Sequence, residues 1–112
     1  MLKINNYNIQ SFTMFEVEGR LDSTHSDELD VLVGKSMENG CKSYLFDFSK
    51  LNYISSYGIR IFVKLLRNNC RIAIILQSES VSSIFEMAGL QEKIEIKSCF
   101  QEAVSIFTQS NN

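Results

Sequence analysis

The chain has 112 residues and a formal net charge of −2, and 45% of its residues are hydrophobic while 21% are charged. This length and composition favour a single domain over residues 1–112 with one core, and they exclude a low-complexity or disordered chain. The slightly acidic balance provides no general positive field, so we expect no nucleic-acid binding. Because the N-terminus has no signal-peptide pattern and no apolar run approaches about 18 residues, we expect a cytoplasmic protein without membrane insertion.

The first half of the chain predicts a hairpin, a helix and a buried strand. Residues 2–10 and 13–19 carry strand-forming side chains and are interpreted as a hairpin at one side of a sheet. Hydroxyls and acids at 23–28 predict the start of a helix that ends at 39–40. The nearly continuous apolar run 44–48 then predicts a central strand buried on both faces, followed by a short loop.

The second half predicts further alternation of helices and strands. A helix opens at Ser55 and Ser56 and ends at 68–69, because its apolar side chains share one face and its basic side chains another. The remaining predicted elements are a strand at 72–76, a short helix at 80–87 closed by Gly89 in a left-handed cap, a strand at 93–97 and a helix at 100–107. The order β-β-α-β-α-β-α-β-α predicts an α/β fold with a mixed, mostly parallel β-sheet and helices packed against it.

No pattern in the sequence indicates a cofactor, a metal site or a catalytic centre. Cys41, Cys70 and Cys99 are far apart and form no Cys-x-x-Cys pair, so we expect three reduced thiols. His25 has no serine or cysteine partner at a recognisable spacing and is interpreted as a solvated surface residue. The glycines form no phosphate-binding G-x-G-x-x-G motif. We therefore expect a binding protein and not an enzyme.

Two further groups of charged residues have structural interpretations. Asp47, at the end of the predicted buried strand, is expected to accept hydrogen bonds from loop amides. Arg60, Lys64 and Arg67 share one face of the second predicted helix. We expect this basic face to be solvated, with attraction of an acidic partner as the alternative.

The most informative segment is 45–62, in which a buried strand and a loop lead to a helix opened by adjacent hydroxyls. Upstream, 17–22 reads as a strand ending in Gly-Arg-Leu-Asp, and downstream 81–90 reads as a helix ending in Gly-Leu. In this order and spacing the three segments resemble the STAS domain family, over about residues 10–107. The resemblance implies a single STAS-like domain of the anti-sigma factor antagonist type.

That resemblance implies a function in bacterial partner switching. It predicts a regulator that binds a serine-kinase anti-sigma factor, is phosphorylated by it on a serine at the start of the second helix, and is reset by a serine phosphatase. The partner-binding residues that the resemblance implies are Asp22, Ser23, Ser55, Ser56, Tyr57, Gly58 and Arg60.

The acceptor position departs from the usual family pattern. The usual Asp-Ser-Ser-Gly aligns with residues 55–58, which places Tyr57 where the phosphorylated serine is expected. Residues 54–60 are also similar to family variants that read Ile-Ser-Ser-x-Gly-Leu-Arg. This favours Ser56 as the phosphorylation site and Ser55 as the second choice. Tyr57 is interpreted as an exposed aromatic residue or as a partner contact.

Two alternatives stay open at this point. In the first alternative, Ser55 or Ser56 is only the N-cap of the second predicted helix, and Asp22 is only the cap of the first. In the second alternative the chain is a phosphorylation-independent STAS scaffold or interaction subunit of a transporter or signalling complex.

Overall fold

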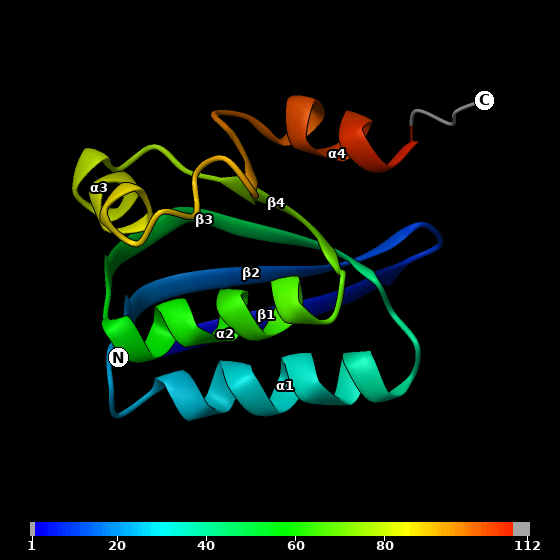
Figure 1. Cartoon of the computed structure of the whole chain (residues 1–112), viewed down its shortest axis with the longest axis horizontal. Helices are drawn as coiled ribbons and strands as arrows, with labels where there is room; N and C mark the ends of the chain where they lie inside the picture. Colours follow the sequence, from blue (N-terminus) through cyan, green and yellow to red (C-terminus); the bar gives the residue numbers. More distant parts are fainter. Residues whose placement is uncertain (1, 109–112) are drawn as a thin grey trace.

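A five-stranded β-sheet with helices on both faces organises the structure (Figure 1), a computed structural model that describes residues 2–108. The elements in chain order are β1 (Leu2–Ile9), β2 (Phe12–Leu21), α1 (Ser26–Glu38), β3 (Ser43–Ile54), α2 (Ser56–Arg67), β4 (Arg71–Ile75), α3 (Glu79–Met87), β5 (Glu95–Lys97) and α4 (Phe100–Thr108). The predicted element order and the α/β class are confirmed. None of the helices within residues 2–108 is long and apolar enough to cross a membrane.

The sheet has the strand order β1-β2-β3-β4-β5, and only the hairpin pair β1 and β2 is antiparallel. β3 lies in the middle, as its apolar sequence predicts. Because β2 and β3 are parallel and each is followed by a helix, their carboxyl ends meet the first turns of α1 and α2 at one end of the molecule (Figure 1). The parallel pairing therefore gathers two loops that are distant in sequence.

β3 continues beyond the apolar run that predicted it. The sequence indicated a strand at 44–48 and then a short loop, but the strand extends to Ile54 and pairs with β2 as far as Leu21. Two register irregularities in this pairing shift the alternation of side chains, so Leu51 and Ile54 are both buried although they lie three positions apart. The predicted loop is wrong because a bulged strand loses the strict period of two.

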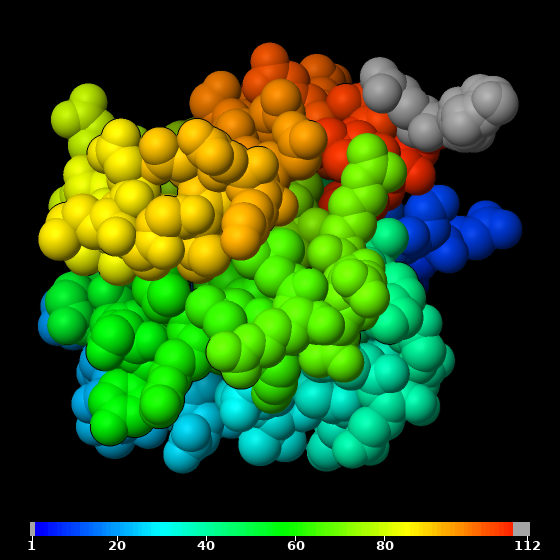
Figure 2. All heavy atoms as spheres, viewed as in Figure 1, coloured from blue at the N-terminus to red at the C-terminus, as the bar shows by residue number. Residues whose placement is uncertain are grey.

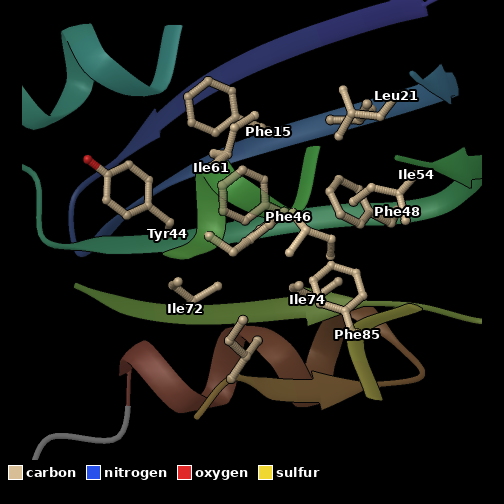
Figure 3. Packing of buried hydrophobic residues seen from close by; sticks show 14 of the residues in the cluster. Phe15, Leu21, Tyr44, Phe46, Phe48, Ile54, Ile61, Ile72, Ile74 and Phe85 are labelled. Atoms are coloured by element: carbon tan, nitrogen blue, oxygen red, sulfur yellow. The ribbon is translucent and has the colours of Figure 1, made fainter. Parts of the chain in front are cut away.

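Most of the core lies between the sheet and helices α1, α2 and α3, and its centre is aromatic (Figure 3). The ring centroid of Phe62 on α2 lies 4.8 Å from that of Phe46 on β3 and 5.2 Å from that of Phe85 on α3, both in edge-to-face geometry. Such pairs contribute roughly 0.5–1.5 kcal/mol each beyond the burial of their area. This packing fixes α2 against β3.

α4 covers part of the opposite face of the sheet. A smaller core cluster joins Met14 and Leu45 of the sheet to Ala103 and Ile106 of α4. α4 packs mainly on β3, β4 and β5. The β1 side of this face is therefore more open than the face covered by three helices.

β1 and β5 form the two edges of the sheet. β1 carries Lys3 and three asparagines, and β5 is only three residues long. Asparagine and lysine are both depleted in strands in general, and short or charged strands are common at sheet edges because they discourage pairing with other chains.

The helix ends follow the expected chemistry. Gly89, which the sequence predicts in a left-handed cap after α3, has a φ angle of +75°. Asn69 takes the same conformation after α2, with a φ of 60°. Asparagine tolerates this region better than most residues with a side chain.

Candidate functional site

The loops after β2 and β3 are tied together at the carboxyl edge of the sheet. The backbone amide of Ser55, just after β3, donates to the carbonyl of Leu21, the last residue of β2, at 3.0 Å. Asp22 and Ser55, which the sequence assigned to one site, are therefore the next residues along two bonded strands. Figure 2 shows the start of α2 (green) at the surface beside the start of α1 (light blue).

Ser55 and Ser56 are adjacent in sequence but differ in environment. Ser55 is the N-cap of α2, with extended backbone angles, and its hydroxyl accepts a hydrogen bond from the amide of Gly58 at 3.3 Å. It is half-buried. Ser56 is the first residue of the helix and its side chain is exposed. The capping role that the sequence left open for either serine therefore belongs to Ser55, and Ser56 is left exposed at the surface.

Gly58 allows the first turn of α2 to sit directly on the ends of β2 and β3. A Cβ atom at this position would lie 2.8 Å from Ile54 Cγ1 and 3.1 Å from Leu21 Cδ2. Both neighbours are fully enclosed in the core. A side chain at position 58 would therefore push the helix start away from the strands.

Replacing Gly58 with alanine is expected to destabilise the fold by about 1–3 kcal/mol, because overpacking a closed core displaces its neighbours. Urea unfolding measures this loss. Gly34→Ala is the matched control, since no atom lies within 4 Å of the added methyl group. Alanine within α1 should stabilise the protein by roughly 0.5–1 kcal/mol. A neutral Gly58→Ala variant would contradict the close packing.

Asp22 organises the turn that leads into α1. One of its carboxylate oxygens, Oδ1, accepts hydrogen bonds from the amides of Thr24 and His25 at 3.1 and 2.9 Å, and it lies 2.8 Å from His25 Nδ1. Because a carboxylate only accepts, His25 donates through Nδ1. The hydrogen bond from the His25 side chain is the main cause that holds the pKa of Asp22 below its ordinary value.

This arrangement corrects two expectations from the sequence. The hydroxyls of Ser23 and Thr24 do not cap α1, which begins at Ser26 after a His25 N-cap that makes no side-chain capping bond. Asp22 takes that role by ordering the preceding turn. His25 is also not a freely solvated residue, because its ring is paired with Asp22.

The lowered pKa of Asp22 predicts an acid-dependent loss of stability. A carboxylate whose pKa is lower in the folded than in the unfolded state stabilises the fold above its unfolded pKa, and this contribution is lost as the pH falls through the folded pKa. The stability difference between the wild type and Asp22→Asn should therefore be constant above about pH 5 and shrink below about pH 4. Urea unfolding at several pH values measures it. A difference that grows on acidification would contradict the pairing.

Tyr57 and Arg60 form the exposed part of the first two turns of α2. Tyr57 is 53% exposed, and the guanidinium carbon of Arg60 lies 5.4 Å from the centre of its ring. Together with Ser56 they line a shallow surface depression. A second depression runs between α1 and α2 and is lined in part by Asp27 and Arg60. The exposed hydroxyl, the aromatic ring and the cation are thus neighbours on one surface.

The basic face of α2 is only partly solvated. Lys64 forms an ion pair with Asp30 of α1, which links the two helices. Arg60 and Arg67 are exposed. The Lys64 side chain is 41% exposed, so the ion pair lies at the surface and the predicted solvated face acquires an acidic neighbour from within the chain.

Sequence reasoning missed a second aromatic and cationic pair near this edge. Arg20 of β2 and Tyr53 of β3 are register partners, and the Arg20 guanidinium carbon lies 4.3 Å from the ring centre of Tyr53. Tyr53 is 40% exposed. Extending the predicted strand through 54 would have revealed the pair, since parallel pairing places the residues before Asp22 and before Ser55 side by side.

The other residues that could carry chemistry lie away from this edge of the sheet or have structural roles. Oδ1 of Asp47 accepts hydrogen bonds from the amide and hydroxyl of Ser49, as expected for amide binding, although Ser49 lies within β3 and not in a loop. Cys70 is buried immediately before β4, and burial raises the pKa of its thiol. A raised pKa is the opposite of what an activated nucleophile needs. Within residues 2–108 no group of three or more His, Cys, Asp or Glu side chains could hold a metal ion.

The fold and site define a small α/β domain that presents a capped helix start, with an exposed hydroxyl, at the carboxyl edge of its sheet. The STAS domain profile matches residues 3–103. The chain therefore belongs to the STAS domain family, as the sequence motifs implied. Among curated proteins, none matches the chain in sequence.

Solved structures with the same fold include an anti-sigma factor antagonist. An anti-sigma factor antagonist from Mycobacterium paratuberculosis is similar with a TM-score of 0.85 and 12% identity, over 96% of this chain and 94% of that one. The Bacillus cell fate determinant SpoIIAA in its phosphorylated form gives a TM-score of 0.71 and 14% identity, over 95% and 98%. A serine-to-glutamate variant of RsbS from Moorella thermoacetica gives 0.73 and 13%, over 94% of both chains. At these identities the likeness establishes the fold.

Proposed function

We propose that this chain is an anti-sigma factor antagonist-like regulator that binds a serine-kinase anti-sigma factor, and that phosphorylation of Ser56 weakens the complex. In this proposal residues 1–112 form one cytoplasmic STAS domain, and a serine phosphatase restores the binding form. The partner contacts the carboxyl edge of the sheet through Asp22, Ser23, Ser55, Ser56, Tyr57, Gly58 and Arg60. The observation that carries the proposal is the exposed hydroxyl of Ser56 at the first position of α2.

The geometry supports Ser56 over Ser55 as the phosphate acceptor. The Ser55 hydroxyl already accepts the hydrogen bond that caps α2, and a phosphate on this oxygen would disturb a bond worth about 1 kcal/mol. Ser56 is exposed and has no such capping role. In the transfer, the Ser56 oxygen forms a bond to the γ-phosphorus of ATP, the bond to the bridging oxygen breaks, ADP leaves, and the hydroxyl proton passes to a base on the kinase.

A phosphate on Ser56 changes the surface without requiring the domain to refold. The first turn of a helix has unpaired amides and a positive dipole, so a group with a charge of roughly −1.5 to −2 is tolerated there. Arg60 lies four residues further along the same helical face and lines the same depression, which places a cation within reach of the phosphate. A partner that docks on this surface with apolar or acidic groups would have to desolvate the new charge.

A second candidate function is favoured by the exposure of Tyr57. This residue stands where the family usually carries its acceptor serine, and a serine kinase does not modify it. Its exposed ring suits a permanent protein contact, because tyrosine is enriched at interfaces. On this reading the chain is a scaffold or interaction subunit of a transporter or signalling complex, and it binds its partner regardless of phosphate.

One experiment separates the two functions. The chain is isolated from its own cells, its phosphorylation sites are mapped by mass spectrometry, and the proteins that co-purify with it are identified in the same sample. Phosphate on Ser56 together with a bound serine kinase would support the switch. An unmodified chain bound to a protein that is not a kinase would support the scaffold function instead.

A further inference from the structure

An exposed apolar surface lies on the face of the sheet that α4 covers only in part. Tyr7 and Ile9 of β1 and Phe100 of α4 are 45%, 42% and 46% exposed, and Met14 of β2 forms the floor beside them. Tyr7 and Met14 are direct register partners, so both side chains project from the same face of the sheet. We call these four residues the β1–α4 patch. Contiguous exposed apolar side chains of this kind mark interaction sites more often than isolated ones do.

The layer architecture explains why this patch is open. α1, α2 and α3 pack over one face, whereas the other face carries α4, which lies mainly over β3, β4 and β5. The strip beside α4, over β1 and β2, has no helix of this chain among residues 2–108. It is an open hollow and not an enclosed cavity. Its shape suits an element that lies on the sheet next to α4.

The edge of the patch is acidic. Glu16 and Asp47 line this hollow, and no lysine or arginine within residues 2–108 does so, whereas Lys3 and Lys50 line a neighbouring hollow that shares the two carboxylates. The hydroxyl of Tyr7 donates to Glu16 Oε1 at 3.0 Å, and the neighbouring carboxylate raises the pKa of Tyr7. The exposed ring of Tyr7 and the charged rim are therefore joined by a direct contact.

We propose that the β1–α4 patch binds an amphipathic helix of a partner protein whose apolar stripe is flanked by lysine or arginine. The apolar stripe packs on Tyr7, Ile9 and Phe100 beside α4, which completes the second helical layer. The basic residues face Glu16 and Asp47, and this charge complementarity sets the orientation of the helix. A second copy of the chain fits less well, because an isologous contact would bring the carboxylates of both copies into one interface.

This site is independent of the proposed switch. The patch lies on the α4 face of the sheet, while Ser56 lies at the start of α2 on the opposite face. A partner helix on the patch would therefore leave the exposed hydroxyl accessible. A variant that disrupts binding at one site is therefore expected to leave the other site intact.

The test uses the full chain, labelled with ¹⁵N, and a peptide of about 15 leucines and lysines arranged to give an amphipathic basic helix. Titration should move the amide resonances of Tyr7, Ile9, Met14 and Phe100 and leave those of the first turns of α1 and α2 in place. A peptide of the same pattern with glutamate in place of lysine should cause no shifts. Absence of shifts with the basic peptide, or shifts centred elsewhere, would overturn the proposal. Concentration-dependent shifts of the patch without peptide would overturn it in favour of a second copy.

Separate variants test the charged rim and the exposed apolar residues of the patch. Glu16→Gln combined with Asp47→Asn keeps oxygen acceptors for the local hydrogen bonds while removing both charges, and it should raise the Kd for the basic peptide about three- to tenfold. Ile9→Thr keeps a β-branched residue in the strand and should also weaken binding. Glu86→Gln on α3, an exposed acid outside the patch, is the control and should leave the Kd unchanged. An equal loss of peptide affinity in all three variants would indicate non-specific attraction and would also overturn the proposal.

Discussion

Under the switch that we propose, Ser56→Asp should weaken binding of the chain to a serine-kinase anti-sigma factor by about ten- to a hundredfold. A partner that covers the start of α2 must remove water from the added carboxylate, and a cost of roughly 1.4–2.8 kcal/mol gives this change in affinity. Isothermal titration calorimetry with the purified kinase measures it. The aspartate should be tolerated by the fold, because negative charge is favourable in the first turn of a helix.

Two control variants make this result specific to the site. Ser56→Ala should bind like the wild type, because it adds no charge. Ser80→Asp places the same charge in the first turn of α3, at another exposed serine, and should leave the affinity unchanged. Equal binding by the wild type and Ser56→Asp would remove Ser56 from the mechanism. Equal weakening by Ser80→Asp would indicate a general charge effect.

Phe62→Ala should destabilise the fold by about 3–5 kcal/mol, the cost of removing a large side chain from a closed core. Phe62 is fully buried, and its ring meets Phe46 of β3, Phe48 of β3 and Phe85 of α3. Small domains are stable by only about 5–15 kcal/mol, so the variant should be close to unfolding at elevated temperature. Urea unfolding followed by circular dichroism measures the loss.

Phe100→Ala is the matched control for this substitution. The same side chain is removed, but Phe100 is half-exposed at the start of α4, so the loss of stability should be much smaller. Because Phe62 fixes α2 against β3, Phe62→Ala should also weaken partner binding in proportion to the unfolded fraction. Unchanged stability would show that α2 is held by contacts other than this aromatic cluster.

Much of the fold follows from short-range patterns in the sequence. The period-two alternation of β2, the apolar run in β3 and the helical stripe of α2 each predict an element that is present. The second half of β3 was missed because its register irregularities place Leu51 and Ile54 in the core three positions apart. A pattern of that kind resembles a loop or a helical turn unless the partner strand is known.

The site was predictable only where one short segment contains it. Ser55 and Ser56 stand together in sequence, and their roles separate once the backbone angles of the helix start are known. The pair of Arg20 with Tyr53 depends on strand register, and the ion pair of Asp30 with Lys64 depends on the packing of α1 beside α2. Such contacts between distant segments leave no periodic signal in one sequence.

The polar edges of the sheet have a consequence for a regulator of the kind that we propose. β5 is too short to offer other chains much to extend, and Lys3 and the asparagines of β1 make pairing along that longer edge less favourable. A protein that acts by sequestering its target stoichiometrically has to be abundant, since each copy neutralises at most one target. Abundance raises the risk that exposed strand edges pair between molecules. The lysine and asparagines of β1 and the shortness of β5 are therefore features that oppose such pairing at high protein concentration.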